Sequence, residues 1–318
     1  MIALLLAVLP CPPTSAASAR PIPVTASALA LNPEDPSLTR VGRLEFLAGF
    51  ELTSDDETFG GLSGLLVEGE RALFITDRGD WIQGRLSHDA TGRLTGIAEV
   101  TVAPMLGFGR EKVAHSTSLG DAEAVARLSD GSLMVGFEQR HRLWLYRPGD
   151  DPANARPVHG GAPRLLKQAK RNGGIEALEE VEPGRLLALT ESLRGSNGDL
   201  LGFYIGQRTE IVRLVSDGAF VPTDLARLPS GDMLLLERRF SLLGGVAAQL
   251  RLIPSAQLSV RRLRPKLVAR LERPLNIDNF EGLAVAEQAG ETMVYIVSDD
   301  NFSVWQRTLL LQFRLLPE

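Results

Sequence analysis

The sequence predicts an all-β protein: a β-propeller of four-stranded antiparallel blades, with five blades favoured and six as the alternative. Three observations support this fold. A strand–turn–strand motif recurs five times at intervals of about 50 residues, and no segment has the length and apolar period of a long helix. In addition, an unpaired strand near the start of the chain complements an incomplete repeat at its end.

Each motif contains an apolar strand, a turn with Gly or Pro, and a returning strand that ends on an acidic residue. The motifs lie at 61–78, 121–138, 174–191, 222–237 and 278–302. When one residue of each is aligned, the steps are 60, 53, 48 and 57 residues; the aligned residues are Ser63, Glu123, Glu176, Asp224 and Glu281. Propeller blades repeat roughly every 40–50 residues. The long first interval leaves room for a degenerate copy, and therefore for a sixth blade.

Further strands follow most motifs and fill out the blades. Third strands are expected at 143–146, 202–205, 250–253 and 309–313, and fourth strands at 93–102, 209–216 and 266–271. The last repeat ends after its third strand, whereas residues 44–50 form a strand without a hairpin of its own. We expect this N-terminal strand to complete the last blade, which closes the ring and leaves no open sheet edge.

The chain divides into a signal peptide at 1–19, an N-terminal extension at 20–41 and a single propeller domain at 42–318. The apolar run 2–9 is too short to span a bilayer, and it leads to the small-residue cleavage pattern Ala17-Ser18-Ala19. We therefore expect a periplasmic or secreted protein with no transmembrane segment in the mature chain. A buried first strand is the alternative interpretation of the apolar run.

Cysteine content and charge exclude several classes of function. Cys11 is the only cysteine, so cleavage after Ala19 would leave a mature chain without cysteine. Such a chain can form no disulfide and cannot use a thiol in catalysis. A lipidated Cys11 is the alternative. A net charge of −5 and a pI near 5.6 argue against nucleic acid or an anionic membrane as the main partner. Neither observation determines the oligomeric state.

Two columns of acidic residues follow from the repeats. The first, at the strand starts, is Ser63, Glu123, Glu176, Asp224 and Glu281; the second, at the strand ends, is Asp77, Glu138, Glu191, Glu237 and Asp299. Hairpin geometry places both columns at one end of the sheets, and the first strand of each blade lines the central channel. Nine of the ten residues are acidic, so carboxylates should converge at this end.

Converging carboxylates repel one another unless positive charge compensates them. A hard cation such as Ca²⁺ accepts several carboxylate oxygens at once. Arginines beside the second column could do the same without a metal, and the candidates are Arg78, Arg140, Arg194, Arg238 and Arg239. Both explanations remain open. The tryptophans Trp81, Trp144 and Trp305 are expected to pack in or between the blades.

The motifs together resemble the phytase-like family, often labelled as having esterase-like activity of phytase. The residues that carry the resemblance are 60–64, 75–79, 121–124, 174–178, 223–225, 236–238, 279–283 and 298–301, and it covers roughly residues 42–315. The resemblance implies an exported bacterial β-propeller that hydrolyses phosphate or carboxylate esters. The better-understood propeller phytases bind Ca²⁺ through acids on the channel face and hold phosphate with Lys and Arg.

The leading hypothesis is a metal-assisted ester hydrolase acting on a small phosphate or carboxylate ester. Its proposed catalytic residues are Glu123, Glu176, Asp224 and Glu281, which with Asp299 would also bind the metal. The proposed substrate-binding residues are Asp77, Arg78, Glu138, Arg140, Glu191, Glu237, Arg238 and Asp300. The alternatives are a non-catalytic propeller that binds a ligand or protein on the same face, and a lactonase-type metal hydrolase.

Overall fold

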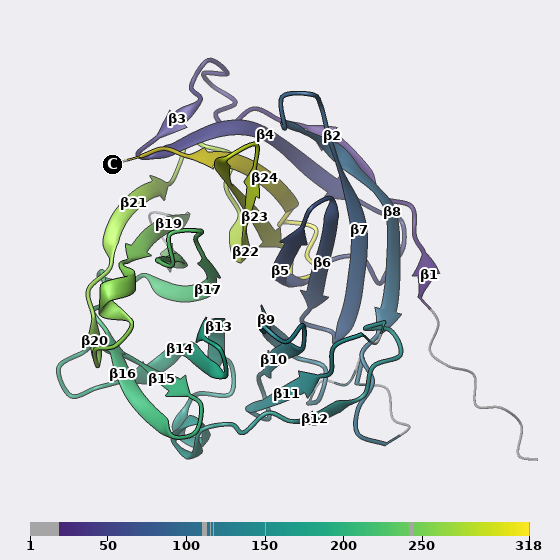
Figure 1. Ribbon diagram of the computed structural model, residues 1–318. Coiled ribbons are helices and arrows are strands. Elements are labelled where there is room, and N and C mark those ends of the chain that lie inside the picture. Colours follow the sequence, from purple (N-terminus) through teal and green to yellow (C-terminus); the bar gives the residue numbers. More distant parts are fainter. Residues whose placement is uncertain are drawn as a thin grey trace, which may run out of the picture.

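Five antiparallel sheets stand around a central axis and form a five-bladed propeller (Figure 1). The computed structural model describes residues 19–109, 113, 114, 116, 118–149, 151–241 and 245–317. The prediction of an all-β propeller with five blades is confirmed, and the six-blade alternative was wrong. The predicted signal peptide lies outside the described residues except for Ala19.

The first three blades follow chain order from the axis outward. Blade 1 contains β5 (Leu62–Glu68), β6 (Arg71–Thr76), β7 (Asp80–His88) and β8 (Leu94–Pro104). Blade 2 contains β9 (Ala122–Arg127), β10 (Leu133–Phe137), β11 (Arg142–Tyr146) and β12 (Pro157–His159). Blade 3 contains β13 (Ile175–Glu182), β14 (Arg185–Arg194), β15 (Leu200–Ile205) and β16 (Thr209–Leu214).

The last two blades complete the ring. Blade 4 contains β17 (Val221–Arg227), β18 (Met233–Ser241), β19 (Gly245–Ile253) and β21 (Lys266–Leu271). Blade 5 contains β22 (Asn279–Gln288), β23 (Glu291–Asp299), β24 (Thr308–Leu315) and β4 (Leu44–Thr53). Short strands extend some edges: β1 (Arg20–Pro21), β2 (Thr25–Ala28), β3 (Arg40–Val41) and β20 (Arg262–Leu263).

The N-terminal strand closes the ring, as predicted. β4 pairs antiparallel with β24 from Leu44 opposite Leu315 to Leu52 opposite Thr308. The last blade therefore combines three strands from the end of the chain with one from its beginning. Its otherwise open edge at β24 is covered, which is how propellers avoid an exposed inner sheet edge.

The core is divided into five clusters, each between two consecutive blades. Blades 1 and 2, for example, share a cluster in which Trp81 meets Tyr146 with ring centroids 5.1 Å apart. The cluster between blades 5 and 1 includes Phe50 of the closing strand and Tyr295 of β23. Each blade therefore buries apolar side chains on both faces, and the ring is held together by all five contacts.

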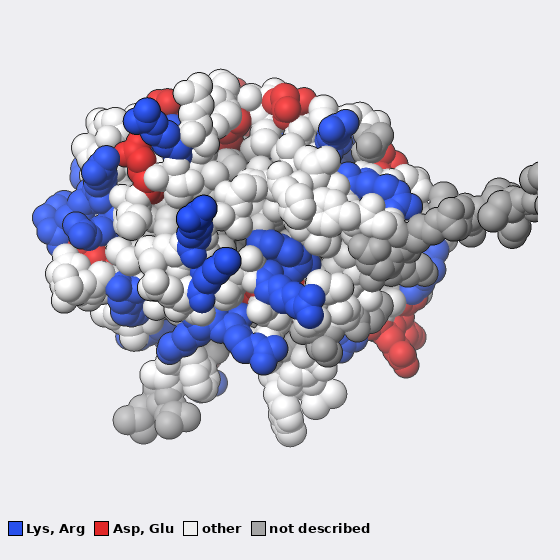
Figure 2. All heavy atoms as spheres, turned by 90° about the horizontal axis from the view of Figure 1, so that it is seen from below, with Lys and Arg blue, Asp and Glu red and all other residues white. Residues whose placement is uncertain are grey.

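One side of the ring is rich in basic side chains. Figure 2 shows the side of the ring where β12 and β16 lie, and Lys and Arg side chains gather on it. The segment between β11 and β13 contributes the exposed residues Arg147, Arg156, Arg164, Lys167, Lys170 and Arg171. The two helices of the described chain are 3-10 turns, η1 (Arg164–Gln168) and η2 (Ser255–Gln257), and neither is long or apolar enough to cross a membrane.

Candidate functional site

A break in strand register marks the start of the inner strand in every blade. At each break one residue of the inner strand has no partner on the second strand; these residues are Ser63, Glu123, Glu176, Thr223 and Glu281. A bulge of this kind bends the strand and redirects the unpaired side chain. The ring therefore presents one redirected side chain per blade, at the same end of the channel.

The second strand contributes one further residue per blade at this level. In blade 5, Ser298 pairs with Phe280 just before the bulge, and Asp299 is the next residue. The equivalent residues around the ring are Asp77, Glu138, Glu191, Arg238 and Asp299. In four blades this position is acidic, and in blade 4 it is an arginine.

Blade 4 is offset by one residue from the columns that the sequence predicted. Thr223, not Asp224, is the unpaired residue of β17, and Arg238, not Glu237, occupies the second position. The Asp224 carboxylate accepts hydrogen bonds from the backbone N–H groups of Leu225 at 2.7 Å and Leu283 at 2.6 Å, which ties β17 to β22. Asp224 therefore joins two inner strands and does not line the cavity described below.

Glu237 is also turned away from that cavity. Its fully buried carboxylate lies 3.0 Å from Arg251 Nη1 and accepts a hydrogen bond of 2.8 Å from Gln249 Nε2. This buried ion pair is internal to blade 4. The roles predicted for Asp224 and Glu237 by acid-to-acid alignment are therefore not supported by their positions.

Eight carboxyl groups surround a cavity of about 210 Å³ at the bulged end of the channel. They belong to Asp77, Asp121, Glu123, Glu138, Glu176, Glu191, Glu281 and Asp299, and the other lining residues are Asn172, Arg238 and Asn301. Among the described residues, Arg238 is the single Lys or Arg of this lining. The described lining thus carries far more potential negative charge than positive charge.

Burial and mutual repulsion raise the pKa of most of these carboxyl groups. Burial raises the pKa of Asp77 to about 7, against the opposing effect of Arg78. Burial, followed by repulsion from neighbouring carboxylates, raises the pKa of Glu123, Glu176 and Asp299 well above the usual range. Without added positive charge, the cavity therefore retains protons that exposed carboxyl groups would have released at neutral pH.

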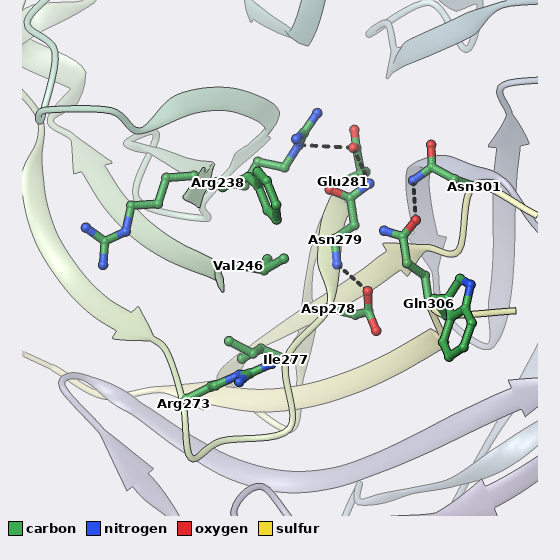
Figure 3. Close-up of a pocket in the computed structure, with 12 residues that line it drawn as sticks. Arg238, Val246, Arg273, Ile277, Asp278, Asn279, Glu281, Asn301 and Gln306 are labelled. Atoms are coloured by element: carbon green, nitrogen blue, oxygen red, sulfur yellow. Dashed lines mark hydrogen bonds and ion pairs between the residues drawn. The ribbon is translucent and has the colours of Figure 1, made fainter. Parts of the chain in front are cut away.

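Arg238 compensates part of this charge on one side of the cavity. Its Nε atom lies 3.1 Å from Glu281 Oε1 (Figure 3). Its Nη2 atom lies 3.9 Å from Glu191 Oε1. Asn279 Nδ2 donates a further hydrogen bond of 2.8 Å to Glu281 Oε1. Burial still raises the pKa of Glu281, although Arg238 opposes the effect.

The carboxyl groups of the cavity form two candidate cation sites, one of which shares Glu281 with the Arg238 ion pair. Ligand atoms of Asp121, Glu123 and Glu138 lie within 4.8 Å of one another, and so do those of Glu123, Glu176 and Glu281. Glu123 belongs to both groups. One Glu138 oxygen also accepts hydrogen bonds from the backbone N–H groups of Gly173 and Gly174. These bonds hold the carboxylate beside the start of β13.

Besides Glu237, three more of the predicted substrate-binding residues lie outside this cavity. Arg78 packs on the ring of Phe302, with its guanidinium carbon 3.2 Å from the ring centroid. Asp300 accepts hydrogen bonds from Gly61 N at 2.9 Å and Phe302 N at 3.0 Å, and so links blade 5 to blade 1. Arg140 is exposed and is not part of the cavity lining.

A second, larger cleft of about 550 Å³ lies beside the acidic cavity between blades 4 and 5. The two share Arg238, Glu281 and Asn301 in their linings. The cleft is otherwise lined by Arg239, Phe240, Val246, Arg273, Ile277, Asp278, Asn279, Trp305 and Gln306 (Figure 3). The cleft therefore adjoins the acidic cavity along these three shared residues.

Sequence reasoning missed most of this cleft. Trp81 and Trp144 are buried as predicted, but Trp305 is 90% exposed at the cleft, so its assignment to the core was wrong. Arg273 and Ile277 lie between the fourth blade and the start of β22, outside every repeat column. Asp121 was missed in the cavity although it directly precedes β9, two residues before Glu123.

Comparison with solved structures supports the propeller architecture. An α-L-arabinofuranosidase from Podospora anserina matches with a TM-score of 0.51 and 11% identity, over 86% of this chain and 97% of that chain. The catalytic domain of a GH62 α-L-arabinofuranosidase from Coprinopsis cinerea matches with a TM-score of 0.50 and 10% identity, over 93% and 99%. At these identities the similarity shows the fold alone.

Sequence comparison gives the family. No curated protein matches the chain. The family model for phytase-like proteins, described as esterase-like activity of phytase, matches residues 57–302, which include the inner strands of all five blades. The chain therefore belongs to the phytase-like family.

Proposed function

We propose that the protein is a cation-dependent hydrolase of phosphate or carboxylate esters. The observation that carries the proposal is the cavity with eight carboxyl groups and a single arginine. So many carboxylates at one point favour a bound cation, because each of them raises the pKa of its neighbours. The family description, esterase-like activity of phytase, supports ester hydrolysis as the reaction.

The residues present fit a hard divalent cation, and we propose Ca²⁺. The described residues of the cavity lining offer carboxylate and amide oxygens and neither His nor Cys, which is the donor set that Ca²⁺ prefers. Asp77 Oδ1 is buried and has no hydrogen-bond partner among the described residues, as expected for an atom that interacts with a bound group. The residues that would hold the cation are Asp121, Glu123, Glu138, Glu176 and Glu281.

The remaining residues of the cavity have separate roles in the proposed reaction. Bound Ca²⁺ would neutralise the carboxylates and polarise an ester oxygen. Arg238, where cavity and cleft meet, can donate from its guanidinium to a phosphate or carboxylate oxygen of the substrate and so orient it. Asp77 lines the same cavity, and its ionised carboxylate can accept a proton from an attacking water.

Calorimetry with Ca²⁺ and with chelator tests the cation, and an ester assay tests the reaction. Saturation at about 100 times the dissociation constant should stabilise the folded protein by roughly 2.7 kcal/mol. Glu281→Gln removes one charge while keeping the shape of the side chain, so it should weaken Ca²⁺ binding at least tenfold. Glu287→Gln is the matched control, because Glu287 is exposed at the far end of the same strand, β22.

The two readouts separate the possible outcomes. Calcium-dependent hydrolysis of 4-nitrophenyl phosphate or 4-nitrophenyl acetate that is lost in Glu281→Gln supports the proposal. Calcium binding without turnover of any ester would favour a non-catalytic binding propeller. The absence of any thermal shift with Ca²⁺ in the parent protein would refute the metal-centred site.

We also propose that the protein is exported to the periplasm or the cell exterior. The support is the apolar run 2–9 followed by Ala17-Ser18-Ala19. N-terminal sequencing of the protein from its native host should find a chain that starts near Arg20. A retained Met1 would contradict export by this route, and a lipidated Cys11 would indicate membrane anchoring.

A further inference from the structure

The cleft beside the acidic cavity has a different chemical character from the cavity itself. Three arginines line it, Arg238, Arg239 and Arg273, while its carboxyl groups, Asp278 and Glu281, already have partners. Asp278 accepts hydrogen bonds from Asn279 N at 3.0 Å and Arg307 N at 3.1 Å, and Glu281 pairs with Arg238. Positive charge is therefore available on this side of the site.

Two of these arginines have unused hydrogen-bonding capacity. Within the described part of the chain, the Arg273 side chain has no hydrogen-bond or ion-pair partner, and it is exposed to the cleft. The Arg239 Nε atom is buried without a hydrogen-bond partner, while its Nη2 atom contacts Glu272 Oε2 at 3.4 Å. The Arg239 Nη1 atom also has no hydrogen-bond partner among the described residues, so both guanidinium groups have donors available for an anion in the cleft.

Apolar side chains line the same cleft. Figure 3 shows Val246 and Ile277 between the Arg238 and Arg273 side chains. Trp305 is 90% exposed and Phe240 is 65% exposed, although both are large and apolar. Exposed aromatic side chains that line a pocket are typical of ligand-binding sites, where they provide apolar contact area.

We propose that this cleft binds an amphipathic anion, and that the natural substrate is an ester with an aromatic or alkyl group and a second anionic group. The second anion lies between Arg239 and Arg273, and the apolar group packs against Ile277 and Trp305. The ester to be cleaved then lies at the junction formed by Arg238, Glu281 and Asn301. A fully polar polyphosphate would leave the apolar surface of the cleft unused. The assignment of the ester rests on the proposed function, whereas the binding of an amphipathic anion does not.

Tryptophan fluorescence provides a direct binding assay, because Trp81 and Trp144 are 0% and 5% exposed and only Trp305 faces the cleft. The probe is 4-carboxybenzylphosphonate, which carries two anionic groups on an aromatic ring and cannot be hydrolysed as an ester. It should cause a saturable change in emission and bind at least tenfold more tightly than inorganic phosphate or benzyl alcohol. The Trp305→Phe variant should lose the fluorescence change but retain binding by calorimetry.

Substitutions in the cleft test the placement of the two parts of the ligand. Arg273→Gln should weaken binding of the probe about tenfold and reduce its dependence on salt, and Trp305→Ala should weaken it several-fold. Arg208→Gln is the matched control, because Arg208 is an exposed arginine in the β15–β16 turn of blade 3. Unchanged affinity in both cleft variants, or equal affinity for probe and inorganic phosphate, would overturn the inference.

The test of probe binding in the cleft does not depend on whether the cavity binds Ca²⁺. Probe binding that persists in Glu281→Gln, where calcium binding is lost, supports the cleft inference whatever the reaction proves to be. Calcium-dependent ester hydrolysis without any probe binding would leave the proposed function standing and reject the amphipathic substrate.

Discussion

Raising the pH of the metal-free protein from 5 to 8 should destabilise it, and Asp77 accounts for a defined share of the effect. Burial raises the pKa of Asp77 to about 7 from an ordinary value of 3.8; Arg78 opposes the shift, and Asp121, Asp300 and Glu281 add to it. The folded state therefore binds this proton more tightly than the unfolded state. Its stabilising contribution is complete below pH 3.8 and is lost as the pH rises through 7.

The magnitude follows from the size of the shift. A difference of about three pKa units corresponds to about 4 kcal/mol, of which about 2.5 kcal/mol is lost between pH 5 and pH 8. An unfolding entropy of about 2.1 cal/mol/K per residue, over roughly 300 residues, gives about 0.6 kcal/mol/K. The Tm should therefore fall by about 4 °C from Asp77 alone. Glu123, Glu176 and Asp299 act in the same direction, because the pKa of each is also raised.

Differential scanning calorimetry in chelator, at pH 5, 6, 7 and 8, measures this dependence. The difference between the parent and Asp77→Asn isolates Asp77 from other groups, including His88, whose burial-lowered pKa acts in the opposite direction. Asp55→Asn is a suitable control, because Asp55 is exposed and lies outside the cavity. Identical pH profiles for the parent and Asp77→Asn would refute the reasoning. Saturating Ca²⁺ should flatten the parent profile, because a bound cation keeps the carboxylates ionised.

Three further substitutions or truncations have distinct expected outcomes. Arg238→Gln removes the one arginine among the described residues of the acidic cavity, so calorimetry should show tighter Ca²⁺ binding. The kcat/KM for an anionic ester should fall at the same time. A rise or a fall of Ca²⁺ affinity and kcat/KM together would contradict the role of Arg238 in orienting substrate. Glu237→Gln leaves Arg251 buried without its counter-ion and should lower the unfolding free energy by about 3–5 kcal/mol in urea titrations, without affecting Ca²⁺ affinity. Deletion of residues up to Thr53 removes β4 and exposes β24, so the truncated protein should aggregate or lose cooperative unfolding; parent-like stability would mean that β4 is dispensable for closure.

The fold could be predicted because its signals are local. Apolar strands, Gly and Pro turns and their period are visible in the sequence, and the unpaired strand at 44–50 has its complement at the end of the chain. The predicted fourth strand at 266–271 coincides with β21, and the one at 209–216 includes β16. Ring closure follows because an unpaired edge would otherwise remain.

The site was harder to predict because it depends on strand register. In four blades the residue after the bulge is small: Gly64, Ala124, Ala177 and Gly282. This position is crowded, since a Cβ atom on Gly282 would lie 2.5 Å from Val297 Cγ1. In blade 4 the residue after the bulge is Asp224. An alignment that matches acids with acids wrongly places Asp224 at the bulge itself, the position that Thr223 occupies. The apolar residue after Asp224, Leu225, was the available signal, because Leu65 and Leu283 are its equivalents.

The cleft could not be predicted from the repeats, because it is built from parts that do not repeat. Arg273 and Ile277 come from the connection between blades 4 and 5, and Trp305 comes from the turn between β23 and β24. None of them has an equivalent in the other blades. Such residues become neighbours only when blades 4 and 5 pack against each other.

The offset of blade 4 explains how a repeated scaffold can produce an asymmetric site. Five equivalent blades would place acids at every position of the second column, and an anionic substrate would be repelled from all sides. The shift of one residue in β17 and β18 replaces that acid by Arg238, on the side of the ring where the arginine-lined cleft opens. The candidate cation sites, formed by blades 2, 3 and 5, and the arginine-lined cleft, formed by blades 4 and 5, therefore meet at Glu281. Under the proposed function, an ester bound at that junction would contact both Arg238 and the carboxylates proposed to hold the cation.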